Sequence, residues 1–257
     1  MRLVHFTPRE YLSAHPGIFG RPHSAIAEIC LTYLNCQQVR TLSATSSAHL
    51  SSLIRDKPFI RYCSLFWGVQ AKKELSSSAM SLALHLFREY SGHISVALQV
   101  NDEVDEDECD FIPGLEWSGL HCASHFGITE VVATLIGMRG YDLNEGDYWE
   151  RPTLSLAALQ GHEDVVKILL EREEVNPNKP NNHGATPLWF ATAHGHEGVV
   201  KILLESEEVN PDKPDNYGGT PLMSAAEKGH EGVVKILLEH EEVKPDKSDR
   251  MGKTPLS

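Results

Sequence analysis

Apolar and polar positions in the second half of the chain recur with a fixed period of 34 residues. Four glycines mark this period: Gly127, Gly161, Gly195 and Gly229. After each glycine, apolar residues return at helical spacing and form one wide face, which in the third copy consists of Val199, Val200, Ile202, Leu203 and Leu204. A fixed period of this length indicates an array of stacked repeats.

A shorter helix is predicted before each of these glycines. Thr-Pro-Leu stands at 186–188 and again at 220–222. Threonine caps helices well, and proline suits the first helical position because it lacks an amide proton that would have no partner there. Small residues follow, and the glycine then ends the helix.

One unit of 34 residues cannot bury enough apolar surface to offset the conformational entropy of ordering its own backbone. Neighbouring units must therefore supply the remaining contacts. The pattern predicts a linear stack of helix pairs that is stabilised by the interfaces between units.

These residues resemble the ankyrin-repeat family, in which Thr-Pro-Leu, Ala-Ala, Gly-His, Val-Val and Leu-Leu follow one another in this order. The resemblance implies an all-α ankyrin-repeat solenoid at 117–257, preceded by a small helical region. We expect units at 117–150, 151–184, 185–218 and 219–252, with a partial unit at 253–257. Gly119-Leu120-His121 replaces Thr-Pro-Leu in the first unit, which resembles a divergent terminal repeat.

The units also depart from the family pattern. Glu150 occupies the place of the turn glycine, and Glu-Glu-Val at 173–175, 207–209 and 241–243 replaces the glycine that usually follows the second helix. Ser155, Trp189 and Met223 replace a histidine of the first helix that only His121 retains. We assign Trp189, Phe190 and Met223 to core packing between helices.

Residues 1–100 predict a helical region. Ser24 precedes an apolar face that includes Ile26 and Ile29, so we expect it to cap a helix, and further helices fit 59–73 and 79–90. The stretch from Ser43 to Ser52 is serine-rich and predicts a loop, whereas residues 3–7 have a strand-like pattern.

A second resemblance covers the same region. Val4-His5-Phe6-Thr7, residues 26–34, Tyr62, Trp67-Gly68 and Ala71-Lys72 resemble the winged-helix and helical segment that follows the NACHT ATPase module in fungal NLR-like proteins. In that family the segment leads to C-terminal ankyrin repeats. The resemblance implies the sensor end of such a protein.

Charge is unevenly distributed along the chain. Residues 1–100 carry ten Lys and Arg against five Asp and Glu, residues 101–117 carry none against eight, and residues 118–257 carry thirteen against twenty-three. Acidic surfaces repel phosphate backbones, so we expect no nucleic-acid partner. The acidic stretch at 101–116 lacks the ligand spacing of a calcium loop and predicts a solvated linker.

Five cysteines without a CxxC pair favour a reducing compartment, and we expect an intracellular, cytoplasmic location. No apolar run approaches the roughly 20 residues that a membrane span needs, so no membrane partner is expected.

The sequence predicts no catalytic residue, cofactor or metal site. His162-Glu163, His196-Glu197 and His230-Glu231 begin like a zinc-protease motif, but Val166, Val200 and Val234 stand where its second histidine would be. We expect each histidine to hydrogen-bond locally where two helices meet. Gly252-Lys253-Thr254 resembles a phosphate loop, but it falls in the repeat register of Gly218-Gly219-Thr220.

Candidate partner-binding residues are those that vary between otherwise similar units, at the turn tips and just before the helix-ending glycine. In the ankyrin resemblance they line the concave face on which protein partners bind. The candidates are Tyr148, Trp149, Asn182, His183, Ala193, His194, Asn216, Tyr217, Glu227, Lys228, Arg250 and Met251. Tyrosine and tryptophan supply large contact areas at low entropic cost.

The final unit has no polar closing repeat, so we expect its apolar face, including Val233, Ile236 and Leu237, to be partly bare. Fraying, self-association and a continuation of the polypeptide are each consistent with that end. The sequence as a whole predicts a protein–protein interaction module that forms the ligand-sensing part of an NLR-like protein. The alternatives are a general ankyrin scaffold and a metal-dependent enzyme in residues 1–100.

Overall fold

The computed structural model describes residues 22–34, 68, 70–89, 117–138 and 140–255. Within these residues every regular element is helical, and a single isolated bridge joins Gly146 to Pro152. The helices are α2 (Pro22–Leu34), α6 (Ser77–Glu89), α8 (Gly119–Phe126), α9 (Thr129–Gly137), α10 (Thr153–Leu159), α11 (Glu163–Leu170), α12 (Pro187–Ala193), α13 (Glu197–Leu204), α14 (Pro221–Glu227) and α15 (Glu231–Leu238). The predicted all-α solenoid is confirmed.

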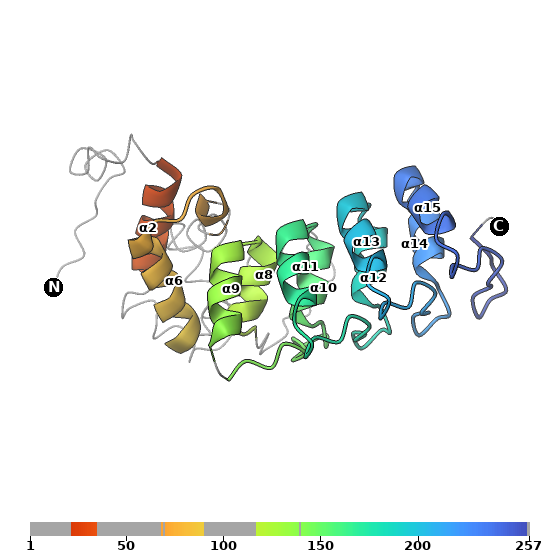
Figure 1. The fold of residues 1–257 in the computed structure, drawn as a ribbon, viewed down its shortest axis with the longest axis horizontal. Helices are drawn as coiled ribbons and strands as arrows, with labels where there is room; N and C mark the ends of the chain where they lie inside the picture. The colour runs from red at the N-terminus through yellow and green to blue at the C-terminus, as the bar shows by residue number, and fades with distance from the viewer. Residues whose placement is uncertain (1–21, 35–67, 69, 90–116, 139, 256–257) are drawn as a thin grey trace, which may run out of the picture.

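Successive helices form four antiparallel pairs that stand side by side along the chain (Figure 1). The first helices of the pairs, α8, α10, α12 and α14, contact one another in order, as do the second helices α9, α11, α13 and α15. Buried apolar residues of the N-terminal helices and of both rows form one continuous core that runs from Ala27 to Val243. Each unit thus buries its apolar face against its neighbours, as the fixed period predicts.

The ends of the first helices follow from the predicted local signals. The Oγ1 atom of Thr186 accepts a hydrogen bond from the amide of Trp189 at 3.2 Å, and Thr220 caps α14 in the same way. In the divergent first unit, Ser118 takes this role for α8. Gly195 follows α12 with a φ of 73°, a left-handed conformation that suits glycine at a helix end.

The N-terminal helices cover the first end of the array (Figure 1). α6 matches the helix predicted at 79–90, and it packs against α2 on one side and against α8 and α9 on the other. The Cβ and Cγ atoms of Phe87 lie so close to Gly119 that a β-carbon there would overlap them, and the ring of Phe126 lies equally close to Gly68. Aromatic rings therefore join the helical region to the first repeat.

Two predictions require correction. Ser24 does not cap α2, because the helix begins at Pro22 and the hydroxyl of Ser24 instead accepts a hydrogen bond from the amide of Ser76 at 3.1 Å. At the other end, Ile236 is half-buried as expected, but Val233 and Leu237 are buried, and Leu238 is exposed instead, at 51% exposure. The outward direction of Leu238 could not be read from the spacing of the apolar run alone.

Several predicted features lie outside the described residues. They are the strand-like segment at 3–7, the serine-rich loop at 43–52, most of the helix at 59–73 and the acidic linker at 101–116. Of the predicted helix at 59–73, residues 68 and 70–73 are described, and they are helical.

Candidate partner-binding face

Each turn tip is built around one side-chain oxygen. The Oδ1 atom of Asp215 accepts hydrogen bonds from the amides of Tyr217 and Gly219, at 2.8 Å each. The residues that take this role recur every 34 positions: Asp147, Asn181, Asp215 and Asp249. Short polar side chains favour such local turns. The tips are therefore defined conformations rather than open loops.

Neighbouring tips are joined by backbone hydrogen bonds. The amide of Asn182 donates to the carbonyl of Trp149 at 3.0 Å, and the amide of Asn216 donates to that of His183 at 2.8 Å. The amide of Arg250 continues the row by donating to the carbonyl of Tyr217 at 3.1 Å. This row fixes the predicted tip residues side by side along one edge of the array.

Most of the predicted tip side chains are exposed. Tyr148 is 52% exposed, Tyr217 is 70% exposed and Met251 is 81% exposed. Asn182, His183, Asn216 and Arg250 are also exposed. Large side chains held outward on fixed turns can contact a partner without a large loss of entropy.

Trp149 is half-buried because it packs among its own neighbours. The guanidinium of Arg151 lies 4.5 Å from the centre of the indole ring and pairs with the carboxylate of Asp147 at 2.6 Å. Tyr148 meets the indole edge-on, with 5.6 Å between ring centres. This arrangement fixes the orientation of both aromatic rings in the first tip.

The predicted positions before the helix-ending glycines divide into two groups. His194, Glu227 and Lys228 are exposed. Ala193 is buried, at 8% exposure, and its carbonyl accepts a hydrogen bond from Nε2 of His230 at 3.1 Å. The side chain of Ala193 therefore offers little surface to a partner.

The first-helix residues that we assigned to core packing also divide. Phe190 is buried, whereas Trp189 and Met223 are half-buried. Trp189 and Phe190 meet edge-on, with 5.6 Å between ring centres. The core assignment is confirmed for Phe190, and the other two side chains keep part of their surface at the first-helix row.

The Gly-His histidines connect consecutive units. Nε2 of His196 donates to the carbonyl of Leu159 in the preceding unit at 2.9 Å, and His162 donates likewise to the carbonyl of His125 at 2.8 Å. The expectation of a local hydrogen bond is wrong, since each acceptor lies 37 residues earlier in the chain. These rings hold repeats together, and their Nε2 atoms are occupied by carbonyl acceptors.

A second row of inter-repeat contacts was missed by sequence reasoning. The Oδ1 atom of Asn178 accepts from the amide of Asn210 at 2.7 Å, while its Nδ2 atom donates to the carbonyl of Glu208. Asn144 makes the same pair of bonds one unit earlier. The recurrence of Asn144, Asn178 and Asp212 at intervals of 34 was the available signal.

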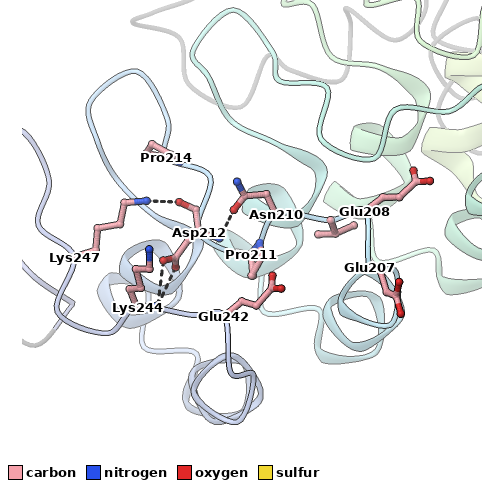
Figure 2. A pocket seen from close by; sticks show the side chains of 10 residues that line it. Glu207, Glu208, Asn210, Pro211, Asp212, Pro214, Glu242, Lys244 and Lys247 are labelled. Carbon is pink, nitrogen blue, oxygen red and sulfur yellow. Dashed lines mark hydrogen bonds between the residues drawn. The ribbon is translucent and has the colours of Figure 1, made fainter.

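Lysines reinforce this row. Nζ of Lys213 donates to the carbonyl of Asn178 at 2.7 Å, and Lys247 donates to the carbonyl of Asp212 one unit later. Figure 2 shows the last step, where Nζ of Lys247 and the backbone amide of Lys244 donate to Asp212 beside an open pocket that Glu207 and Glu242 also line. The pocket carries charges of both signs, and its lysine and aspartate groups belong to the contacts between units.

Burial changes the proton affinity of the histidines at the first two repeats. Desolvation, together with the nearby His162 and Arg151, lowers the pKa of His125 to about 4. Desolvation also lowers the pKa of His162 to about 4, with Lys72 and His196 opposing its protonation. Both rings are therefore neutral near pH 7.

The sequence motif that resembles a phosphate loop, Gly252-Lys253-Thr254, has a structural role. Gly252 has a φ of 80°, and the amide of Lys253 donates to Asp249, so both belong to a turn tip. In the part of the chain that the structure describes, no three His, Cys, Asp or Glu side chains are grouped to hold a metal ion. Among the described helices, none is both long and apolar enough to cross a bilayer.

Comparison with known families identifies the array. A family model described as ankyrin repeats in three copies matches residues 120–215 and, in a second match, residues 207–257. These matches span more than half of the chain. The chain belongs to the ankyrin-repeat family. Members of this family are protein–protein interaction modules, and the family is generally non-enzymatic.

The chain is also similar to one curated enzyme over a short stretch. Putative glutaminase 2 of Caenorhabditis elegans is 39% identical over 51 residues, which are 20% of this chain and 8% of that protein. The chain thus spans less than a tenth of the length of that relative. Such a short match does not establish enzyme activity.

Proposed function

We propose that the ankyrin array recognises a protein partner through its turn tips and the exposed ends of its first helices. The proposed face consists of Tyr148, Trp149, Asn182, His183, His194, Asn216, Tyr217, Glu227, Lys228, Arg250 and Met251. The observation that carries the proposal is the outward projection of Tyr148 and Tyr217 from tips that hydrogen bonds hold in a row. Exposed tyrosines on a preorganised backbone are typical of binding surfaces.

We further propose that the chain is the sensing or regulatory part of a fungal NLR-like signalling protein that acts inside the cell. Two features support this role. Residues 26–34 carry the apolar pattern that resembles the segment after a NACHT module, and they lie in α2. The helical region precedes the repeats and packs on the first of them, which is the order expected of such proteins. A general scaffold without a signalling role is the alternative.

Self-association is part of the proposal. Leu238 is 51% exposed in the fourth repeat, whereas the equivalent Leu204 is half-buried and packs against the core. We propose that two chains bury this surface against each other.

A pull-down with matched variants tests the proposed face. The baits for fungal cell extract are the 257-residue chain, the double variant Tyr148→Ala/Tyr217→Ala and the double variant Glu173→Ala/Glu207→Ala. Glu173 and Glu207 are exposed residues of the loops that follow α11 and α13, so this variant changes the surface elsewhere. We expect proteins captured by the unmodified chain and by the glutamate variant to be lost with the tyrosine variant.

The three baits are first compared by circular dichroism, because only variants of equal helical content test the surface. Identical capture by all three would refute the proposed face. If the captured protein contains a NACHT module or a downstream signalling domain, the NLR-like role is supported. Partners without any such domain would favour the general scaffold.

A further inference from the structure

We propose that Lys72 and His162 form a pH-sensitive latch that holds the helical segment at 70–73 against the second repeat. In this latch, neutral His162 accepts a hydrogen bond from the Lys72 ammonium, and protonation of the ring releases the lysine. The inference does not depend on the identity of a partner, so it stands apart from the proposed function.

The geometry gives each nitrogen of His162 one task. Nε2 lies 2.8 Å from the carbonyl of His125, which can only accept, so the ring proton resides on Nε2. Nδ1 lies 2.9 Å from Nζ of Lys72 and therefore offers it a lone pair. The ring is also held against Gly127, where a β-carbon would overlap it. The imidazole thus bridges the 70–73 segment and the first repeat.

A proton on Nδ1 removes this acceptor and places two positive groups at hydrogen-bond distance. The groups that face the ring are Lys72 of the N-terminal segment, His125 of α8 and His196 of the next unit. None of these is an acid. The neighbouring Glu163 directs its carboxylate over Gly198. Repulsion between imidazolium and ammonium is therefore not offset by a facing carboxylate in the described residues.

Two equivalent histidines provide natural controls. His196 and His230 make the same inter-repeat bond to the carbonyls of Leu159 and Ala193. In the described part of the chain, neither has a lysine hydrogen-bonded to its Nδ1 atom. The hydrogen bond to the preceding repeat is therefore common to His162, His196 and His230, and the contact with Lys72 distinguishes His162.

The latch is tested in the full chain by two measurements. An NMR titration of the histidine rings gives the pKa of His162 in the unmodified protein and in Lys72→Met. Hydrogen exchange, corrected for the intrinsic effect of pH, gives the protection of amides 70–74 over the same range. We expect Lys72→Met to raise the pKa of His162, since removing the like charge eases protonation. We also expect protection of 70–74 to fall roughly fivefold or more as His162 titrates.

The variant His162→Gln removes the titration and keeps a polar side chain that can both donate and accept. It should reduce the fall in protection of 70–74 between pH 7 and 4 to the part that His125 contributes, whereas His196→Gln should leave the pH dependence as in the unmodified protein. An unchanged pKa of His162 in Lys72→Met would overturn the proposal. So would a fall in protection in His162→Gln as large as that of the unmodified protein.

Discussion

The imidazole of His230 lies against the α-carbon of Gly195, so closely that a β-carbon on the glycine would come within 2.7 Å of Nδ1. The pairs Gly127 with His162 and Gly161 with His196 repeat this relationship. Glycine therefore has two roles at this position. Its left-handed backbone ends the first helix, and its missing side chain admits the ring of the following repeat.

Gly229 allows these two roles to be separated. Its φ of 73° equals that of Gly195, but no atom lies within 4 Å of the place where its β-carbon would be. We expect Gly229→Ala to cost about 1 kcal/mol, the backbone term alone. Gly195→Ala should cost about 2–4 kcal/mol, because the clash with His230 is added. Urea unfolding of both variants checks this, and equal losses would contradict the role of the ring.

Glu150 is the one described residue other than glycine with a positive φ, 59°. The equivalent residues of the later tips are Gly184, Gly218 and Gly252. We expect Glu150→Gly to stabilise the chain by about 0.5 kcal/mol, since the strain of the left-handed conformation exceeds the entropy that glycine adds to the unfolded chain. Chemical denaturation measures the change.

The reverse substitution is the matched control for that prediction. Gly252 has a φ of 80° and open space around its α-carbon, so Gly252→Glu changes the backbone preference without a clash. This variant should destabilise the chain by about 1 kcal/mol if the last turn tip unfolds together with the rest of the array. Stabilisation by this variant would show that the left-handed tip tolerates a side chain without strain.

Much of the fold could be predicted from the sequence because the decisive signals are local. Thr186 and Thr220 are followed by proline, and helix-ending glycines recur at fixed intervals, so the start and end of each first helix depend on neighbouring residues. The pairing of helices then follows from their apolar faces. Ser24 was assigned wrongly because a serine before an apolar face looks the same whether it caps its own helix or accepts a bond from Ser76.

The contacts between units were harder to predict. His196 bonds to a carbonyl 37 residues earlier, and no local pattern distinguishes that acceptor from one in its own turn. Asn144, Asn178 and Asp212 recur at a fixed interval in the sequence. Whether their side chains reach the backbone of the next repeat depends on the distance between adjacent repeats, which the sequence does not specify. For the candidate face, the sequence located the exposed tips, whereas the burial of Ala193 became apparent only in the structure.

Asn178 joins the loops of the second and third repeats through two hydrogen bonds that substitutions can separate. Asn178→Asp keeps an acceptor for the amide of Asn210, as Asp212 does for Lys244, but it loses the donor to the carbonyl of Glu208. Asn178→Ala loses both bonds. We expect the free energy of unfolding to fall by about 1 kcal/mol in Asn178→Asp, which loses one hydrogen bond, and by about 2 kcal/mol in Asn178→Ala, which loses two. Thermal and urea unfolding give the order, and an aspartate variant as stable as the unmodified chain would show that the donor contributes nothing.

Leu238 tests the proposed self-association. A lysine at this position would replace the exposed apolar side chain of α15 with a charge. We expect Leu238→Lys to weaken self-association by about tenfold or more, because burying an unpaired charge is unfavourable. Sedimentation velocity over a range of concentrations measures it. Glu239→Lys, which changes charge at the adjacent exposed residue, should have a smaller effect, and equal effects would point to net charge rather than apolar contact.

Acid should destabilise the array through His125. Its pKa is about 4 in the folded chain and near 6.5 when unfolded, so the unfolded state binds more protons between these values. The stability that the neutral ring contributes is complete above pH 6.5 and is lost as the pH falls toward 4.

We expect His125→Phe, whose ring retains contact with Trp117 and Phe126, to reduce the loss of stability between pH 7 and pH 5 by about 1 kcal/mol. Urea unfolding at both pH values measures it. His183→Gln, at an exposed tip, should leave the difference unchanged, and an equal effect of the two variants would exclude burial of His125 as the cause.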